Sequence, residues 1–313
     1  MSSRGRKLNL VQRAETTTAT QPRARPALMQ PRAAASTKPR LAAHWPLIAY
    51  ALLCALAFFT LVPILWMVLS AFKSGGEVLA QPPTWFPREW HPENFQAAWN
   101  FAPFGRYLGN TLVIALTVMV IETLTSALAA YAFARLRFRG RDALFLLYLA
   151  TLMIPRQVTI IPQFIIMREL GWVDTYQGLI IPQAFSAFGT FLLRQYFLSI
   201  PRELEDAARI DGASRWECFW RIILPLSGQA LATLAVFIFL FQWNNLLWPL
   251  IMSNSDETRP IAVGIRRFQG QYSTDWNLLM AAATLATLPV VAVYIFAQRW
   301  FVRGITLSGF GGR

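Results

Sequence analysis

The sequence has few of the residue types on which most enzymes depend. It contains two cysteines and two histidines in 313 residues: Cys54, Cys218, His44 and His91. Two isolated cysteines provide no disulfide framework, so we expect two ordinary thiols. The histidines fall on either side of the first long apolar run, which argues against a metal site or a catalytic triad built on histidine. No Gly-x-x-x-x-Gly-Lys-Ser/Thr phosphate loop occurs, and we therefore expect neither catalytic residues nor an ATP or metal site in this chain.

Charged residues are also scarce, at 14% against 55% hydrophobic residues, a composition too apolar for a soluble domain. Six apolar runs reach the roughly 20 helical residues that cross a bilayer core of about 30 Å. They lie near 45–72, 107–133, 143–167, 178–198, 226–248 and 278–301. Backbone groups must be paired in lipid, and the runs lack the two-residue alternation of barrel strands. The sequence predicts an all-α integral membrane protein with six transmembrane helices within residues 45–302.

The distribution of basic residues predicts the orientation. With the N-terminus inside the cell, the inner segments hold twenty lysines and arginines and the outer segments hold seven. We therefore expect both termini in the cytoplasm of a cell-membrane protein, with residues 303–313 as a cytoplasmic tail. The polar segment between the fourth and fifth runs falls on the same side.

The first 44 residues form a separate region with nine basic residues and Glu15 as the only acid. Such a segment buries too little apolar surface to offset its ordering entropy, and we expect a disordered cytoplasmic tail. Affinity for anionic lipid is the favoured interpretation. A transit peptide and a nucleic-acid-binding tail are alternatives, but scattered prolines interrupt the amphipathic helix that a transit peptide needs. We expect membrane lipid and no nucleic acid as a partner.

The polar segment, residues 199–225, has the signals of two short helices. A helix start is expected at Pro201, because proline is tolerated in a first turn. Three acids then occupy the first turns, where the helix dipole favours negative charge: Glu203, Glu205 and Asp206. Asp211-Gly212 predicts a turn before a second helix over about 214–221.

The small residues of the first short helix would let another backbone approach closely. Ala207 and Ala208 form this smooth patch, and the charges around them can fix the register of a partner. The segment is then a docking element for a groove on another protein. A solvated amphipathic connector on the membrane surface is the alternative.

The spacing of the segment resembles the cytoplasmic loop by which membrane subunits of ABC-type importers engage their ATPase subunits, and we call residues 199–225 the coupling loop. The motif and the acid before it read Glu205, Asp206, Ala207, Ala208, Gly212, Ile222, Leu224 and Pro225. Flanking segments are similar to sugar permeases of the maltose-transporter type over about 45–313. They are 188–197, 208–214, 153–155 with 161–162, and 300–306.

This resemblance implies the type I ABC importer permease fold and a set of partners. A second permease subunit, an ABC ATPase dimer that binds ATP and Mg, an extracytoplasmic solute-binding protein and a sugar substrate would complete the machine. Transport would proceed by alternating access driven by the ATPase. Two departures stand out: Asp206 occupies a position where relatives usually have Glu, and a proline common in relatives is absent around 227–229.

Residues of the translocation pathway are suggested by polar groups in apolar runs. Glu122 falls near the middle of the second run, where an ionisable group is costly and faces a cavity or a polar partner. Gln242, Trp243, Asn244 and Asn245 combine amides with an indole, which suits sugar hydroxyls and ring faces. Interhelical hydrogen bonds and interfacial aromatic anchoring are the alternatives.

The polar segment 253–277 is expected outside the cell. By resemblance it contacts the binding protein, and the candidate residues are Asp256, Arg259, Arg266 and Tyr272. A plain solvated loop is the alternative.

For the function, the resemblance favours import of a sugar or oligosaccharide. The same machine with a polyol, a glycerol-phosphate compound or another small solute is one alternative. A secondary transporter that works alone, with Glu122 at an ion site, is another. A membrane scaffold without transport leaves the two short helices unexplained.

Overall fold

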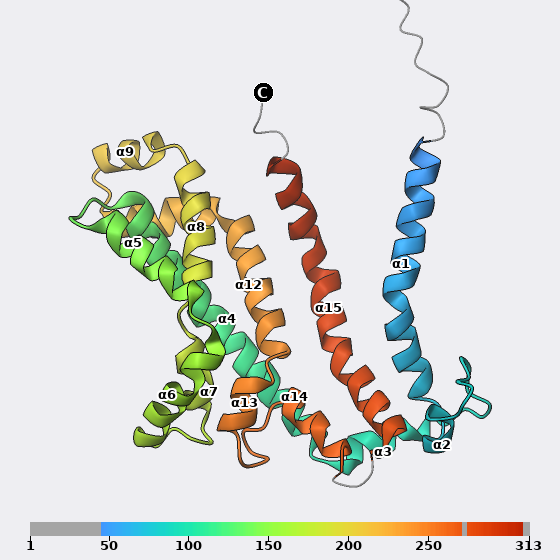
Figure 1. Ribbon diagram of the computed structural model, residues 1–313. Coiled ribbons are helices and arrows are strands. Elements are labelled where there is room, and N and C mark those ends of the chain that lie inside the picture. Colours follow the sequence, from blue (N-terminus) through green and yellow to red (C-terminus); the bar gives the residue numbers. More distant parts are fainter. Residues whose placement is uncertain (1–44, 271–273, 309–313) are drawn as a thin grey trace, which may run out of the picture. The chain divides into compact units, whose positions relative to one another are not determined.

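The computed structural model describes residues 45–270 and 274–308, with the side chains of 46–270 and 274–298, and it is helical throughout (Figure 1). The chain divides into two units, Met1–Leu56 and Ala57–Arg313, and the cores, polar networks and cavities described below lie in the second. The predicted tail 1–44, Tyr272 and residues 309–313 lie outside the described residues. The helices longer than four residues are α1 (Trp45–Ser70), α3 (Glu93–Phe101), α4 (Phe104–Arg135), α5 (Arg141–Ala150), α6 (Arg156–Glu169), α7 (Tyr176–Ile180), α8 (Ala187–Ser199), α9 (Glu203–Ile210), α12 (Gly228–Trp243), α13 (Leu247–Met252) and α15 (Trp276–Ser308).

Shorter elements connect these helices. They are α2 (Gly75–Val78), the 3-10 turns η2 (Thr151–Met153), η3 (Ile181–Gln183) and η5 (Ile265–Phe268), the π-helical η4 (Phe219–Ile223), α10 (Arg215–Cys218), α11 (Leu224–Leu226) and α14 (Ile261–Gly264). A single isolated bridge, between Gln269 and Thr274, is the only β pairing within the described residues.

Three helices are long and apolar enough to cross a membrane by themselves: Pro46–Ser70, Phe104–Arg135 and Trp276–Gln298. Two further candidates are bent pairs, Arg141–Met153 with Arg156–Glu169 at 99° and Arg215–Leu226 with Gly228–Trp243 at 78°. The helical character that the sequence predicts is confirmed. The described residues thus contain three to five candidate spans, and six remains a prediction.

The predicted runs differ from the helices in continuity. The third run is divided at Ile154 and Pro155, because proline has no N–H for a helical bond and excludes helical geometry from the residue before it. The fourth run is divided into α7, η3 and α8. The last helix, α15, continues to Ser308 and includes part of the segment that was expected to be a tail.

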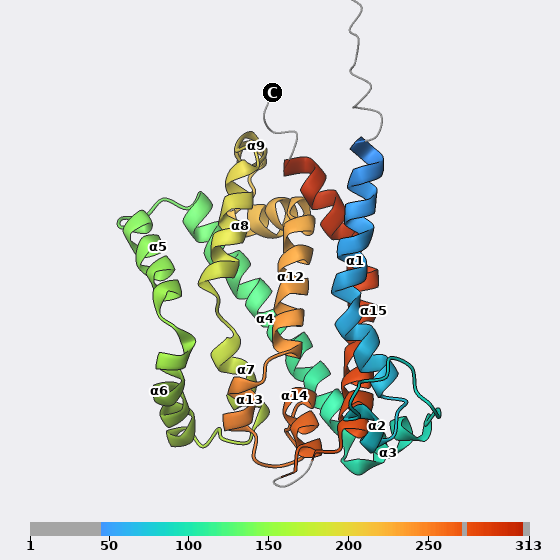
Figure 2. The ribbon, with the colours of Figure 1, turned by 45° about the vertical axis from the view of Figure 1, so that its right-hand side comes forward.

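The main core forms where α4 packs against α8 and α12 (Figure 2). The approach of α8 to α4 is close at Gly189, where a Cβ atom would lie 2.6 Å from Oγ of Ser126. Side chains from all three helices fill the interior, among them Val118, Leu193, Phe197 and Leu234. A second cluster packs α15 against α3 and the start of α4, with Tyr107 and Phe268 at its centre.

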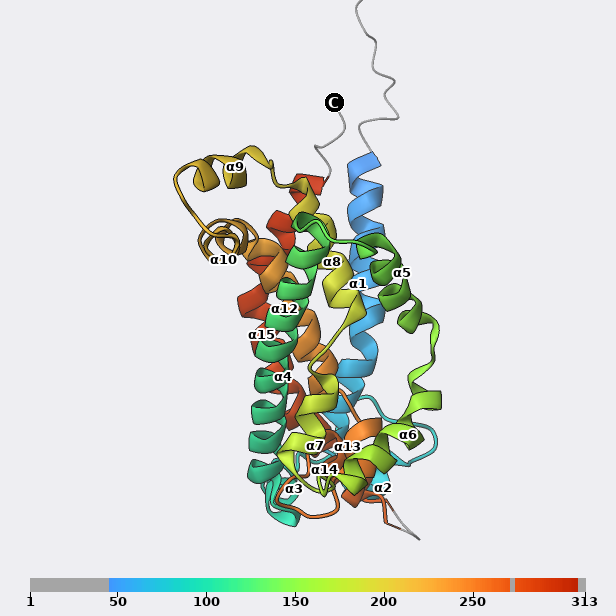
Figure 3. The same ribbon diagram turned by 90° about the vertical axis from the view of Figure 1, so that its left-hand side faces the viewer.

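The long helix α4 connects two polar regions of the second unit. Figure 3 shows α9 and α10 near the C-terminal end of α4, and α3 and α14 near its N-terminal end. Its 32 residues span roughly 48 Å at 1.5 Å per residue. The coupling loop and the 253–268 segment therefore lie at opposite ends of one helix.

Candidate functional site

The coupling loop forms the two short helices that its sequence predicts. The first, α9, begins at Glu203, two residues after Pro201, and its first turn holds the three acids. Gly212 then turns the chain with φ of 92°, a left-handed conformation that favours glycine. Ser214 begins α10 with a capping box, in which its hydroxyl accepts from the Glu217 N–H while the Glu217 carboxylate accepts from the Ser214 N–H.

Glu205 attaches α9 to the membrane helices. Its carboxylate lies 2.9 Å from Nε of Arg135 at the C-terminal end of α4, and the side chains are 8% and 3% exposed. The Tyr131 hydroxyl lies 3.2 Å from the other carboxylate oxygen. Arg135 also donates to the carbonyls of Phe197 and Ile200, at 2.5 and 2.7 Å. The pair therefore connects α4, the end of α8 and α9 within the second unit.

The opposite face of α9 is open. Asp206 and Ala207 are exposed, Ala208 is half-buried, and Ile210 is 87% exposed. Ile210 lies two residues after Ala208 and extends the exposed surface that the Asp206-Ala207-Ala208 motif provides. Sequence reasoning missed Ile210, although an isolated isoleucine among charges was a visible signal.

The end of the loop motif lies at the base of the loop. Ile222 and Leu224 are half-buried and Pro225 is exposed, while Ile223 between them is fully buried in the main core. These residues therefore join α10 to α12.

Part of the predicted pathway lines one cavity. Glu122 from α4 and Asn244 and Asn245 after α12 line a cavity of about 910 Å³, together with Arg156 and Ser186. A second cavity of about 550 Å³ shares Arg156 and Asn245 with the first and adds polar groups from α6. We call the two together the central cavity; their roles in transport remain predictions.

The other two residues of the amide run lie elsewhere. Gln242 is buried and its Oε1 accepts from Nδ2 of Asn245 at 3.3 Å. Trp243 is buried and donates to the carbonyl of Ala286 in α15 at 3.1 Å. Arg156, by contrast, was not among the sequence candidates, although an arginine inside an apolar run was the signal for it.

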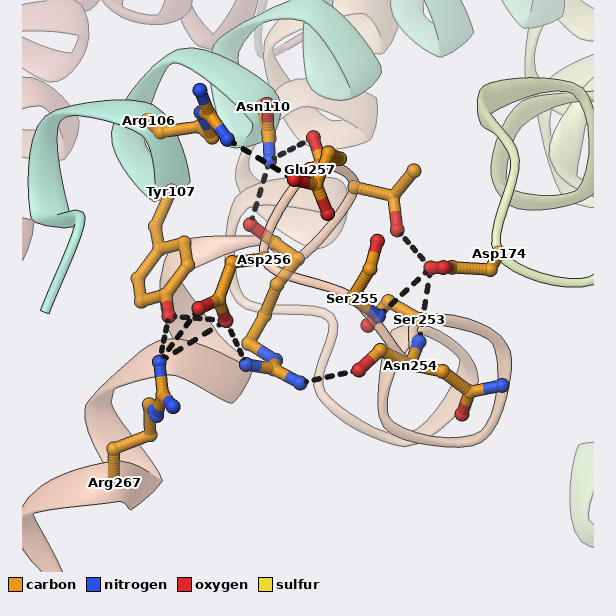
Figure 4. A network of polar contacts seen from close by, with 12 residues as sticks. Arg106, Tyr107, Asn110, Asp174, Ser253, Asn254, Ser255, Asp256, Glu257 and Arg267 are labelled. Carbon is orange, nitrogen blue, oxygen red and sulfur yellow. Dashed lines mark hydrogen bonds and ion pairs between the residues drawn. The ribbon is translucent and has the colours of Figure 1, made fainter.

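The segment after α13 is held by a network around Asp256 (Figure 4). The Tyr107 hydroxyl lies 2.7 Å from the Asp256 carboxylate, Nη1 of Arg267 lies 2.9 Å from it, and Arg259 pairs with it as well. The hydrogen bond from Tyr107 and the charges of Arg267 and Arg259 hold the pKa of Asp256 below its ordinary value, although burial opposes them.

A second set of bonds closes the same segment. Asp174 accepts from the N–H groups of Asn254 and Ser255, at 3.0 and 3.1 Å, and from the Thr258 hydroxyl. Asn110 donates to the carbonyls of Glu257 and Arg259, at 2.9 and 3.0 Å. The segment is thus tied to α4 and to the turn before α7.

The predicted contact residues of this segment have different environments. Asp256 and Arg259 point into the network, and Arg259 is 17% exposed. Arg266 is exposed and forms no ion pair within the described part of the chain. Among the three members of the predicted set that the structure describes, Arg266 is therefore the one free to meet another molecule.

The apolar helices, the exposed two-helix loop and the cavity with polar side chains agree with the permease architecture that the resemblance of the sequence implies. Residues 122–307 match the family described as binding-protein-dependent transport system inner membrane component, and the chain belongs to this family. The expected resemblance is confirmed. The protein is the membrane permease subunit of an ABC importer.

Relatives extend the comparison beyond the family core. The chain is 37% identical over 253 residues to the probable ABC transporter permease protein YurM of Bacillus subtilis, covering 80% of this chain and 83% of YurM. It is 35% identical to the arabinooligosaccharides transport system permease protein AraQ of Halalkalibacterium halodurans, covering 82% and 93%. It is 39% identical to the sn-glycerol-3-phosphate transport system permease protein UgpE of Yersinia enterocolitica, covering 79% and 91%.

A solved structure has the same fold. It is a chain of a bacterial ABC transporter involved in the import of the acidic polysaccharide alginate, with a TM-score of 0.74 and 25% identity. The match covers 84% of this chain and 98% of that chain. The predicted type I importer permease fold is confirmed by this similarity.

Proposed function

We propose that the chain forms half of the translocation pathway for a sugar or oligosaccharide in an ATP-driven, binding-protein-dependent importer. A second permease subunit supplies the other half, an ABC ATPase dimer holds ATP and Mg, and an extracytoplasmic binding protein delivers the substrate. The arabinooligosaccharide relative and the alginate importer support a carbohydrate substrate. The observation that carries the proposal is the coupling loop, which presents one exposed face and is attached to α4 by its other face.

The two faces of α9 give it two roles. Asp206, Ala207, Ala208 and Ile210 contact the ATPase, because small and apolar groups permit close packing in a groove. Glu205 faces Arg135 and passes the displacement of α9 to α4 and α8. ATP-driven closure of the motor thereby changes the packing of the membrane helices and the access of the central cavity.

Substrate passes along the central cavity in this proposal. The carboxylate of Glu122 and the amides of Asn244 and Asn245 supply acceptors and donors for hydroxyl groups. Gln242 and Trp243 hold these residues in place, because Gln242 accepts a hydrogen bond from Asn245 and Trp243 donates one to the Ala286 carbonyl. Six spans, cytoplasmic termini, a basic tail over 1–44 and a C-terminal tail complete the proposed organisation.

The segment 253–268 receives the binding protein. Asp256 and Arg259 hold its shape, and Arg266 makes the contact. Tyr272 belongs to the same proposed surface.

A phosphorylated polyol is the second candidate substrate. The glycerol-3-phosphate permease relative and the guanidinium of Arg156 at the cavity support it, because arginine binds phosphate through paired hydrogen bonds. Uptake of labelled oligosaccharide and of labelled glycerol phosphate by the same reconstituted importer separates the two substrates.

The coupling role is tested by Gly212→Asp in the complete importer reconstituted in proteoliposomes. The substitution places a side chain at φ of 92° and a charge on the exposed turn, with nothing within 4 Å to obstruct it. We expect ATP hydrolysis to continue while uptake falls at least about tenfold, as a loss of about 1.4 kcal/mol in coupling would produce.

Gly140→Asp is the matched control, since Gly140 has φ of 79°, equally open surroundings and a place outside the loop. Normal uptake by the Gly212 variant contradicts the coupling role. Uptake by the chain without ATPase subunits would instead support a secondary transporter.

A further inference from the structure

A small basic pocket lies among the end of α4, α9 and the start of α10. Its volume is about 220 Å³. Five arginines line it, together with Glu205 and Asp206: Arg135, Arg137, Arg202, Arg209 and Arg215. We call these residues the arginine pocket.

The charges of the arginine pocket are not balanced by the protein. The lining carries a formal charge of +3, and the Glu205 carboxylate is already paired with Arg135. The guanidinium groups of the other four arginines form no ion pair or hydrogen bond within the residues that the structure describes. Like charges drawn together in a partly enclosed space repel one another, and a bound anion removes this cost.

The cytoplasmic preference for basic residues does not account for this arrangement. That preference concerns the number of arginines in a segment and not their convergence. Here Arg137 follows α4, Arg202 precedes α9, Arg209 lies in the last turn of α9, and Arg215 begins α10. Four separate positions of the chain thus bring an arginine to one pocket.

The number of unpaired guanidinium groups indicates the class of anion. A carboxylate has two oxygens and one charge, and it can accept bidentate hydrogen bonds from one or two arginines. A phosphate group carries up to two charges and three or more oxygens on a compact centre, which can serve four. A neighbouring cavity of about 610 Å³ shares Arg137 and Arg202 with the pocket and lies at the connection between α4 and α5. This connection follows an apolar helix, where a lipid headgroup is within reach.

We propose that the arginine pocket binds a phosphate group, supplied by an anionic lipid headgroup or by a soluble phosphate compound. The bound group joins the two short helices of the coupling loop to the end of α4. This site is separate from the central cavity, and Asp206 is the residue that it shares with the proposed ATPase contact.

The test compares the complete importer with a variant that carries Arg202→Gln and Arg209→Gln. Both side chains are exposed, so the variant retains the core. Arg221→Gln is the matched control, because Arg221 is 79% exposed in the same loop and lies outside the pocket, 3.7 Å from Glu217. The probes are radiolabelled inorganic phosphate, and phosphatidylglycerol in phosphatidylcholine nanodiscs counted by native mass spectrometry.

We expect each lost guanidinium to weaken binding about tenfold, and the double variant about a hundredfold, as charge-assisted hydrogen bonds predict. The control should bind as the wild type does. Retention of phosphatidylglycerol alone identifies a lipid site, and binding of inorganic phosphate identifies a soluble ligand. Equal binding by the wild type and the double variant overturns the proposal. Binding of neither probe, with an acidic side chain of the ATPase in the pocket of the assembled complex, overturns it as well.

Discussion

Replacing Arg135 should destabilise the permease far more than replacing Asp206, the exposed acid that follows Glu205 in the sequence. Arg135→Gln leaves the Glu205 carboxylate buried without its ion-pair partner, and the Tyr131 hydroxyl is then its one hydrogen-bond donor among the described residues. It also removes the donors to the carbonyls of Phe197 and Ile200. Breaking a buried pair from one side costs about 3–5 kcal/mol, and the loss of these two further bonds places Arg135→Gln at the upper end.

Glu205→Gln should cost less, at about 3 kcal/mol, because Arg135 keeps its two carbonyl acceptors. Asp206→Asn is the matched control and should change the free energy of unfolding by no more than about 0.5 kcal/mol, as exposed positions do. Unfolding of the three variants in mixed detergent micelles with increasing denaturant gives the comparison. A free energy of unfolding for Arg135→Gln within about 0.5 kcal/mol of the wild type would refute the reasoning, and so would equal losses for Arg135→Gln and Asp206→Asn.

Two further predictions concern the 253–268 segment and the helix packing. The pKa of Asp256 is lowered in the folded protein, so its ionised carboxylate stabilises the 253–268 segment above the ordinary value of 3.8. This stabilisation is lost as the pH falls through the lowered pKa. Asp256→Asn should therefore increase amide hydrogen exchange over 253–268 at pH 7 and remove the dependence of the exchange on low pH. Unchanged exchange would contradict the network's role. Gly189→Ala should lower the free energy of unfolding by about 1–3 kcal/mol, because the added Cβ meets Ser126 Oγ at 2.6 Å. Gly109→Ala is the control and should lower it by nothing, because its Cβ meets nothing within 4 Å. Equal unfolding midpoints for the two variants would contradict the close approach of α8 to α4.

Local signals predicted much of the coupling loop. The acids of the first turn, the turn at Gly212 and the second short helix are properties of neighbouring residues, and the structure has all of them. The helical state of the apolar runs follows in the same way from backbone pairing in lipid. The continuity of the helices was harder to predict, because Pro155 divides an apolar run whose composition alone suggests one span.

Contacts between distant residues could not be predicted in this way. Arg135 meets Glu205 across 70 positions, and Tyr107 meets Asp256 across 149. Each choice of partner depends on the packing of α4 against the rest of the unit, which no local pattern specifies. Asp256 likewise faces Tyr107 and two arginines, an arrangement that no local pattern indicated, and its contact with a binding protein remains a prediction.

The continuity of α4 has a consequence for timing. Tyr107 and Arg135 belong to one helix without an internal proline, and they are separated by roughly 42 Å along its axis. A hydrogen-bonded helix of this kind tilts or shifts as a whole, because bending it sharply requires proline, a bulge or an inserted group. Any tilt that the 253–268 segment imposes on α4 therefore reaches Arg135 in the same motion, with no intermediate state in which only one end has responded.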